Sequence, residues 1–254
     1  MTTADLTNAY PTDEARWAAI ERRDRAADGA FFCGVRTTGV YCRPSCSGRP
    51  LRKNVAFHDT REAARAAGLR PCLRCRPDEP IETLAYGFGD TPLGLALAAI
   101  SETGLALLIM GWDRTEMRED LAARFPRARL IEDDAAAGPA LAALVAAIDS
   151  GRPGDLALPL ALDERGTDLQ RAVWKALRDI PAGTTASYAQ VARAIGRPSA
   201  VRAVAQACGA NPVAVLTPCH RVVRSDGALS GYRWGVERKQ ALLAREGVAR
   251  EVAA

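Results

Sequence analysis

The stretch Thr217-Pro218-Cys219-His220-Arg221-Val222 places a cysteine directly beside a histidine, with a proline before the pair and an arginine after it. The thiolate is the nucleophilic form of cysteine, and nearby cations lower the thiol pKa from its ordinary value of about 8.5. So short a motif also fits a plain core residue, because cysteine is among the most buried residue types. The stretch alone predicts either an activated thiol or a buried structural one.

The sequence on both sides of this stretch favours the activated thiol. Asn211-Pro212 lies upstream, Gly231-Tyr232-Arg233 lies downstream, and the basic run Arg238-Lys239 follows. A basic, glycine-marked frame around a Cys-His pair indicates a thiol that acts on an anionic polymer.

The chain from Thr167 onward has helical periodicity. Apolar residues fall on one face at helical spacing, namely Leu169, Val173, Trp174 and Leu177. Pro181-Ala182-Gly183 ends that helix, and two further helices are expected over residues 187–195 and 199–208. Two short helices around a glycine-bearing turn predict a helix-turn-helix, although any αα-corner has the same pattern. The last helix exposes Arg202 among small residues and is slim enough to approach DNA closely.

Upstream of Thr167 the sequence mixes strands and helices. Apolar runs with glycine-bearing turns in residues 82–112 predict strands of a small antiparallel sheet. Helices are expected over residues 115–124 and 138–149, and another strand over residues 156–162. Nearer the N-terminus the pattern predicts a helix over 13–27, strands at 31–35 and 55–57, and a helix from Asp59 to Gly68.

Four of the seven cysteines occur as two close pairs, Cys42-x3-Cys46 and Cys72-x2-Cys75, separated by 25 residues. Two such pairs can supply the four sulfur ligands of a tetrahedral Zn²⁺ site. Ten Lys/Arg and only two Asp/Glu lie within residues 36–76, so this site is expected to do more than hold a small domain together. The cysteines outside the pairs, Cys33 and Cys208, are expected to be buried, and His58 is expected to lie outside the ligand set.

The whole chain has 254 residues and a net charge of +4, which is unevenly spread. Residues 1–80 carry +4, residues 81–166 carry −7 and residues 167–254 carry +7. This distribution predicts two surfaces that could meet nucleic acid, although mild basicity is also common on solvated surfaces. The odd number of cysteines favours metal or catalytic roles over disulfides. With no apolar run of membrane-spanning length and no export signal, we expect a cytoplasmic protein without membrane contact.

Residues from Arg16 to Pro77 resemble the zinc domain of the Ada-type methylated-DNA repair proteins. The resemblance is carried by residues 35–46 (VRTTGVYCRPSC) and 70–75 (RPCLRC). It implies a domain over residues 1–80 that accepts a methyl group from a DNA phosphotriester on Cys42, with Arg43 near the DNA. The implied ligands of one Zn²⁺ are Cys42, Cys46, Cys72 and Cys75.

The C-terminal part is similar to the O6-alkylguanine-DNA alkyltransferase domain of the same family. The motifs include residues 172–174 (AVW), 180–183 (IPAG), 200–204 (AVRAV), 218–222 (PCHRV) and 231–235 (GYRWG). The implied fold class is α+β. It combines the small zinc domain, a ribonuclease-H-like half over residues 81–166, and a helical active-site domain with a helix-turn-helix over residues 167–254.

The same resemblance implies a mechanism on double-stranded DNA with alkyl damage. Cys219 would accept the methyl group of O6-methylguanine, or of O4-methylthymine, once only. His220 would take the thiol proton through a water, Glu246 would hold the imidazolium, and Asn211 would brace the turn. The flipped base and the DNA would be contacted by Tyr188, Arg202, Val222, Tyr232 and Trp234. Trp234 stands where some relatives have glycine and should restrict the pocket to small adducts. The protein is expected to act as a monomer.

Two departures from the family pattern affect this expectation. Thr217 stands where an aliphatic residue is usual, and Pro80 leads almost directly into the alkyltransferase half, without the AraC-like helix-turn-helix pair of Ada-type regulators. An alternative function is a methylation-sensing transcriptional regulator, which the missing pair argues against. A lesion-binding protein without transfer activity is a second alternative, and the presence of Cys219 argues against it.

Overall fold

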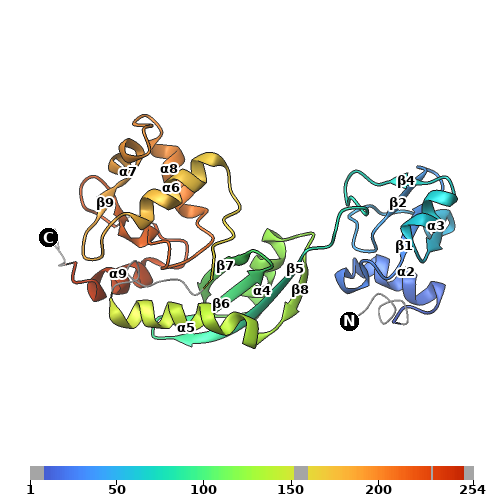
Figure 1. The fold of residues 1–254 in the computed structure, drawn as a ribbon, viewed down its shortest axis with the longest axis horizontal. Coiled ribbons are helices and arrows are strands. Elements are labelled where there is room, and N and C mark those ends of the chain that lie inside the picture. Colours follow the sequence, from blue (N-terminus) through green and yellow to red (C-terminus); the bar gives the residue numbers. More distant parts are fainter. Residues whose placement is uncertain (1–8, 152–159, 230, 249–254) are drawn as a thin grey trace. The chain divides into compact units, whose positions relative to one another are not determined.

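The computed structural model describes residues 9–151, 160–229 and 231–248. The chain divides into two compact units; in Figure 1 the first is drawn mainly in blue and cyan, and the second runs from green to red. The first unit runs to Thr83 and also takes in residues 125–129. The second consists of residues 84–124 together with the chain from Leu130 onward. The three domains expected from the sequence, over residues 1–80, 81–166 and 167–254, stay predictions.

Residues 9–83 form a four-stranded sheet with two α-helices, in the strand order β3-β1-β2-β4. Each α-helix begins after a threonine, Thr12 or Thr60, whose side chain accepts a hydrogen bond from the backbone of the first turn. These helices and the strands β1 and β3 agree with the predicted pattern. The elements are α2 (Asp13–Arg22), β1 (Phe32–Val35), β2 (Val40–Cys42), β3 (Val55–His58), α3 (Arg61–Ala66) and β4 (Arg70–Pro71), with 3-10 turns at Arg25–Ala27 and Arg52–Asn54.

Pairing between β2 and β4, two strands that the sequence did not predict, brings distant cysteines together. The strands run parallel with Tyr41 opposite Pro71. Because both strands run in the same direction, Cys42 and Cys72 follow that pair at the same end of the sheet. The Cys72 amide donates to the Tyr41 carbonyl at 3.0 Å, so the pairing extends up to the second cysteine pair.

The fully buried side chain of Tyr41 fixes this arrangement. Its hydroxyl donates to the Asp78 carboxylate and accepts from Nε of Arg65 at 3.1 Å. Arg65 also forms an ion pair with Asp78 at 2.8 Å. The network ties β2 to α3 and to the segment that follows the second cysteine pair.

The second unit begins with a sheet in the order β7-β6-β5-β8. Antiparallel pairing of β5 with β6 and of β6 with β7 confirms the predicted antiparallel sheet. Helix α5 packs so closely on β5 that a Cβ atom at Gly87 would lie only 2.9 Å from that of Ala137. The elements are β5 (Thr83–Thr91), β6 (Gly94–Ser101), β7 (Gly104–Gly111), α4 (Arg114–Arg124), β8 (Arg129–Glu132) and α5 (Asp134–Ser150).

Two details of this part differ from the sequence prediction. Helix α5 begins earlier than expected, because the Asp133 side chain caps it by accepting from the Ala136 amide at 3.1 Å. The strand expected over residues 156–162 lies mostly outside the described residues. Of its described part, Leu162 forms a single parallel bridge with Leu105.

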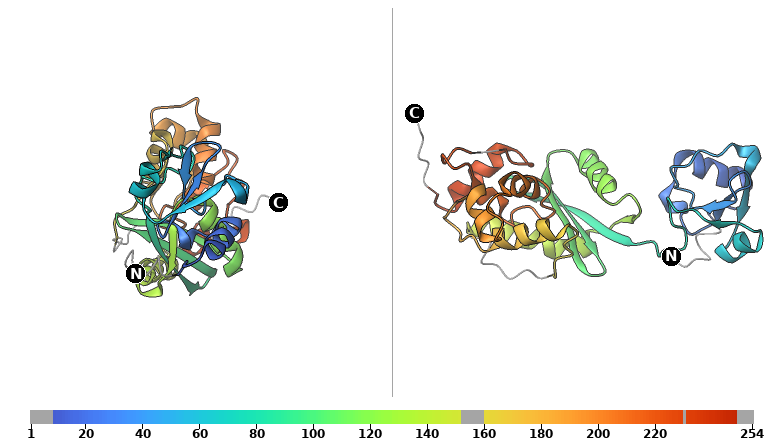
Figure 2. Two further views of the ribbon diagram at one scale, coloured as in Figure 1. Left: turned by 90° about the vertical axis from the view of Figure 1, so that its right-hand side faces the viewer. Right: turned by 90° about the horizontal axis from the view of Figure 1, so that it is seen from above.

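The remaining chain is helical, with α6 (Asp168–Arg178), α7 (Tyr188–Ala194), α8 (Val201–Gly209) and α9 (Val236–Arg245). Helices α6, α7 and α8 pack together, as the yellow and orange segments of Figure 2 show. The predicted face of α6 is buried at Val173, Trp174 and Leu177, and the Trp174 indole donates to the Ala207 carbonyl of α8 at 2.9 Å. None of the described helices is long and apolar enough to cross a membrane.

Two very short strands position the Cys-His stretch. In a parallel pair, β10 (Val222–Val223) lies beside β9 (Ala186–Ser187), with Val223 opposite Ser187. Ser187 is also the N-cap of α7, and its side chain accepts from the Gln190 amide at 3.2 Å. The start of α7, including Tyr188, is therefore held close to the segment that follows Cys219.

Candidate metal centre and nucleophile site

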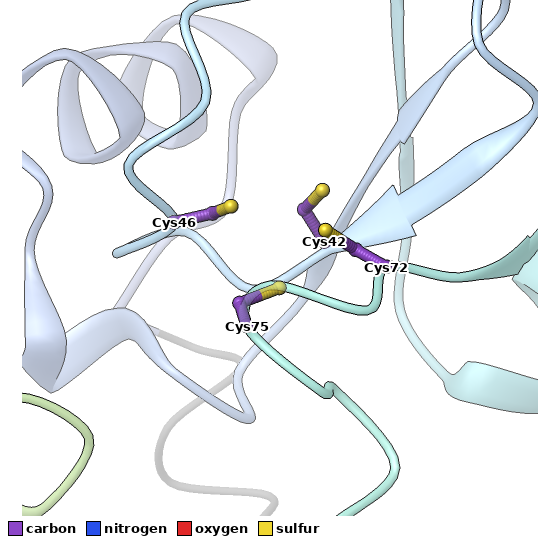
Figure 3. A group of neighbouring side chains, drawn as sticks. All are labelled: Cys42, Cys46, Cys72 and Cys75. Atoms are coloured by element: carbon purple, nitrogen blue, oxygen red, sulfur yellow. The ribbon is translucent and has the colours of Figure 1, made fainter.

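The four paired cysteines form one compact group in the first unit. The Sγ atoms of Cys42, Cys46, Cys72 and Cys75 all lie within 4.8 Å of one another. Figure 3 shows the four cysteine side chains gathered in one place. Sulfur atoms bound to a tetrahedral Zn²⁺ at about 2.3 Å lie somewhat under 4 Å apart, so this donor set fits a zinc ion.

Hydrogen bonds around the cluster orient its two cysteine pairs. The Arg43 amide donates to Sγ of Cys75 at 3.4 Å. The Arg43 guanidinium is buried and donates to the carbonyls of Arg76, at 3.0 Å, and Glu79. Arg43 was expected to contact DNA, but these described contacts link the first cysteine pair to the chain beyond the second.

A buried carboxylate fixes the loop that carries Cys46. Asp28 is 3% exposed and accepts from the Ser45 amide at 3.0 Å and from the Ser45 hydroxyl at 2.6 Å. Burial raises the pKa of Asp28, although the two bonds from Ser45 oppose that change. Ser45 lies inside the first Cys-x3-Cys pair, so the bonds restrict the position of one sulfur ligand.

A cavity of about 410 Å³ opens beside the cluster. Its lining includes three of the paired thiols, the basic side chains Arg49 and Arg74, and Cys33. Cys33 is buried and lies opposite Cys42 in the β1–β2 pairing, but it is outside the four-sulfur group. A thiolate at Cys42 therefore adjoins a space bordered by cations, which suits an approaching phosphate backbone.

The second candidate site is built around Cys219, which opens the 3-10 turn Cys219–Arg221. Asn211 is fully buried and braces this turn. Its amide nitrogen donates to the Thr217 carbonyl at 2.8 Å and to Sγ of Cys219 at 3.2 Å. Its side-chain oxygen accepts from the Val213 amide at 2.9 Å. The side chain thus connects both ends of the loop that leads to the thiol.

His220 and Arg221 converge on one buried carboxylate, that of Glu246. His220 Nε2 lies 2.7 Å from Glu246 Oε1, and Nε of Arg221 lies 3.0 Å from Oε2. A third bond joins Arg221 Nη2 to Oε1 at 3.1 Å, and Nη1 donates to the Ile180 carbonyl at 2.5 Å. The three side chains are 0–1% exposed. The other ring nitrogen of His220, Nδ1, is buried without a hydrogen-bond partner among the described residues.

Burial sets the protonation states in this site. It raises the pKa of the Cys219 thiol to about 11, against the opposing hydrogen bond from Asn211 and the charge of Lys239. Burial also lowers the pKa of His220, against the stabilising contact with Glu246. Burial alone would raise the pKa of Glu246, but the hydrogen bonds from His220 and Arg221 outweigh that effect and lower the pKa. Near neutral pH the site holds a thiol, a neutral imidazole and a carboxylate.

The other predicted residues lie around this centre. Tyr232 and Trp234 pack edge to face with ring centroids 5.1 Å apart, and the buried Tyr232 hydroxyl and Trp234 indole nitrogen have no hydrogen-bond partner among the described residues. The Val222 carbonyl accepts from Nζ of Lys239 at 2.5 Å, which leaves one of its lone pairs for another donor. Arg202 is exposed on α8, and Tyr188 begins α7.

Sequence reasoning missed Arg221 and Lys239. Both belong to the basic frame that was interpreted as facing an anionic polymer, yet both are at most 1% exposed. Arg221 clamps Glu246, and Lys239 lies close enough to Cys219 for its charge to lower the pKa of that thiol. Residue type and spacing do not tell an inward cation from a surface one. The available signals were the position of Arg221 next to His220 and the position of Lys239 on the apolar face of α9.

Comparison with known proteins identifies both halves of the chain. The model for the metal binding domain of Ada matches residues 15–78. The model for the DNA binding domain of 6-O-methylguanine DNA methyltransferase matches residues 168–248. A crystal structure of Mycobacterium tuberculosis OGT in complex with DNA has 37% sequence identity and a TM-score of 0.54, and the match covers 66% of this chain and 96% of that one. The architecture is that of a cysteine methyltransferase joined to a zinc domain.

A relative matches almost from end to end. The bifunctional transcriptional activator/DNA repair enzyme Ada of Escherichia coli is 34% identical, with 92% of this chain and 96% of that protein aligned. A methylated-DNA–protein-cysteine methyltransferase of Mycobacterium bovis is 55% identical over 34% of this chain and 52% of that protein. This chain belongs to the Ada-type family of methylated-DNA repair proteins. The alignment with Ada spans 344 positions, more than the 254 residues present here, so Ada contains sequence without a counterpart in this chain.

The cysteine cluster predicts a defined metal content. We expect one Zn²⁺ per chain, and Cys75→Ser should lose it because three thiolates do not complete the tetrahedral set. Cys33→Ser is the matched control, since it removes a neighbouring buried thiol outside the group. Atomic emission on dialysed protein measures both. Loss of zinc from the Cys33 variant, or its full retention by the Cys75 variant, would contradict the assignment.

The protonation states predict how stability depends on pH. Because the pKa of His220 is lowered by folding, the unfolded chain binds this proton at higher pH, with an unfolded value of about 6.5. The contribution of His220 to the free energy of unfolding is therefore complete above pH 6.5 and is lost as the pH falls toward the lower pKa of the folded protein. We expect the melting temperature to drop between pH 7.5 and 5.5, and to drop less in His220→Asn. An equal drop in the His220→Asn variant and the unmodified protein would contradict this assignment.

Proposed function

We propose that this protein repairs alkylated double-stranded DNA by two irreversible transfers, from O6-methylguanine to Cys219 and from DNA methylphosphotriesters to Cys42. O4-methylthymine is a further substrate of Cys219. The observation that supports the first transfer is the buried chain from Cys219 through His220 to Glu246. Two relatives support methylated DNA as the substrate class: one was solved in complex with DNA, and another is named a methylated-DNA–protein-cysteine methyltransferase. We also propose that the protein acts as a monomer in the cytoplasm.

The transfer to Cys219 needs a proton acceptor, because burial keeps the thiol protonated. His220 supplies one: its Nδ1 is unpartnered among the described residues, while its Nε2 is held by Glu246. The thiol proton passes to Nδ1 through a water, and the carboxylate stabilises the resulting imidazolium. The sulfur then attacks the methyl carbon, a C–S bond forms and the C–O bond to guanine breaks. The product is a thioether, so each Cys219 reacts once.

The base must leave the helix to reach a thiol that is 6% exposed. Arg202, exposed on α8, fills the gap in the stack. Tyr188, at the start of α7, donates to the ring of the leaving base. The Val222 carbonyl uses its remaining lone pair to accept from the base edge, and Tyr232 lines the pocket.

Transfer to Cys42 uses a thiolate that metal binding keeps deprotonated. Zinc supplies this charge stabilisation when it is bound. A methylphosphotriester is neutral and can approach the anionic cluster, whereas an ordinary phosphate is repelled. The cavity beside Cys42, with Arg49 and Arg74 in its lining, is where we place the DNA backbone.

A role as a transcriptional regulator is the alternative that the structure favours less. The chain from Cys75 to α4 is fully described and contains the strands β5, β6 and β7 but no helix-turn-helix pair. The relative Ada, which is named as an activator, carries additional sequence. Repair chemistry is therefore the primary function that we propose.

The proposed acceptor is tested by Cys219→Ala. Transfer of label from O6-methylguanine in a duplex should be abolished, while binding to the duplex survives, because the change removes only a buried sulfur. Cys208→Ala is the matched control: it removes another buried thiol, on α8, and should transfer one methyl group per chain. Peptide mapping after reaction locates the label. Stoichiometric transfer by the Cys219→Ala variant would contradict the assignment of Cys219 as the methyl acceptor.

Methylation of Cys42 should strengthen DNA binding. It converts a thiolate to a thioether, so the formal charge of the cluster with Zn²⁺ changes from −2 to −1 and offsets the surrounding arginines less. The gain should shrink as salt increases, over a Debye length of about 8 Å at physiological ionic strength. The measurement is duplex affinity of the Cys219→Ala protein across a salt series, before and after reaction with methylphosphotriester DNA. Equal affinities at low salt would refute the charge effect, and label on Cys46 would refute the choice of Cys42.

A further inference from the structure

Arg238 is a buried arginine on α9, and each of its three guanidinium nitrogens donates to a backbone carbonyl. Its side chain donates from Nε to Leu93 at 2.7 Å, from Nη1 to Trp234 at 2.6 Å and from Nη2 to Gly111 at 2.7 Å. The residue is 6% exposed. Leu93 lies in the turn between β5 and β6, Gly111 ends β7, and Trp234 belongs to the loop before α9, so one guanidinium joins three separate segments.

Only a planar fork of donors can make these three bonds at once. Bonds from a charged donor are stronger than those between neutral groups. A lysine ammonium is a compact point charge on a flexible stem and cannot place donors at three fixed positions in one plane. The contact is therefore specific for arginine.

An exposed tryptophan covers the outer side of this clamp. The Arg238 guanidinium lies 4.0 Å from the ring centroid of Trp112, although Trp112 is 76% exposed. Gly94 makes room for both, because a Cβ atom there would lie 2.7 Å from the Trp112 ring and 2.8 Å from Nη2 of Arg238. A stacked ring limits the access of water to the three hydrogen bonds, which explains a large apolar side chain at this surface.

The clamp acts on the loop that carries Tyr232 and Trp234, the two aromatic residues that the resemblance places at the acceptor pocket. Arg238 holds the main-chain carbonyl of Trp234, and the Trp234 ring packs edge to face on Tyr232. The Gly235 amide donates to the Tyr232 carbonyl at 3.0 Å and closes the loop between them. Lys239, the next residue of α9, holds the Val222 carbonyl beside Cys219. Adjacent residues of α9 thus hold the backbone carbonyls of Trp234 and Val222.

We propose that Arg238 is a positioning residue that sets the size limit of the Cys219 pocket by anchoring the Trp234 loop to the sheet. This rests on the proposed transfer to Cys219. With the anchor in place, the Trp234 ring stays against Tyr232 and a bulky alkyl group has no room. Without it, the loop can move the ring aside, and larger adducts enter.

The test compares single-turnover rates on duplexes carrying O6-methylguanine or O6-benzylguanine. We expect Arg238→Met to raise the benzyl-to-methyl rate ratio by about tenfold, as Trp234→Gly should, which corresponds to roughly 1.4 kcal/mol. The ratio for Arg238→Lys should lie between those of the unmodified protein and Arg238→Met. In the double variant Arg238→Met/Trp234→Gly the ratio should match that of Trp234→Gly alone, because both changes act on the same ring. Trp112→Ala, a surface change that leaves the fold intact, should raise the ratio in the same direction by about threefold.

The matched control is Arg118→Met on α4. Arg118 also lies over an aromatic ring, 5.2 Å from the Phe88 centroid, and pairs with Glu132, but it does not contact the loop. Its rate ratio should equal that of the unmodified protein. An unchanged ratio in folded Arg238→Met and in Trp112→Ala, or full additivity in the double variant, would overturn the proposal.

Hydrogen exchange separates this inference from the proposed function. Backbone amides of residues 231–235 should exchange faster in Arg238→Met than in Arg118→Met, whether or not methyl transfer occurs. An unmodified protein that transfers no methyl group would contradict the proposed function, and the exchange rates would still decide on the anchor. Equal exchange in the two variants would overturn it.

Discussion

The acceptor turn depends on one buried carboxylate. Glu246, directly after α9, receives hydrogen bonds from Arg221 and a contact from His220, and these side chains are almost completely excluded from water. Burying charges is costly, and the cost is offset only where the geometry satisfies them. Removing one partner leaves an uncompensated charge, with a typical loss of about 3–5 kcal/mol. The same contact that orients the imidazole therefore also attaches α9 to the rest of the unit.

The two candidate acceptor sites favour opposite protonation states of their cysteine. At Cys219, burial raises the pKa, so the thiol stays protonated and inert until a base removes the proton in place. At Cys42, a Zn²⁺ ion held by the four thiolates would keep the sulfur anionic. Reactivity there is limited by what can approach a negative centre. The substrates that we propose differ in the same way, since a base lesion would be selected by shape and a neutral backbone lesion by charge.

Local sequence patterns predicted the elements that are stable through their own periodicity or capping. The antiparallel strands β5, β6 and β7, the buried face of α6 and the spacing of the four cysteines all belong to this group. The two-residue strands β9 and β10 were not predictable, because their pairing depends on segments far apart in the chain. The inward cations Arg221 and Lys239 were missed for a related reason: a basic residue is assumed to face solvent unless its partner is known. Glu246 was found only through family resemblance, since nothing in its local sequence marks it.

The parallel pairing of β2 with β4 has a consequence for folding order. The two cysteine pairs are separated by 25 residues, and closing a loop of that length costs about 3 kcal/mol in chain entropy, apart from a constant. When the metal is absent, this cost is opposed by the short pairing at Tyr41 and Pro71, the network around Asp78 and the bonds from Arg43 to the carbonyls of Arg76 and Glu79. Zinc then acts as a cross-link between the two halves of the unit. The fraction of molecules with a closed cluster thus rises with the free zinc concentration around the protein.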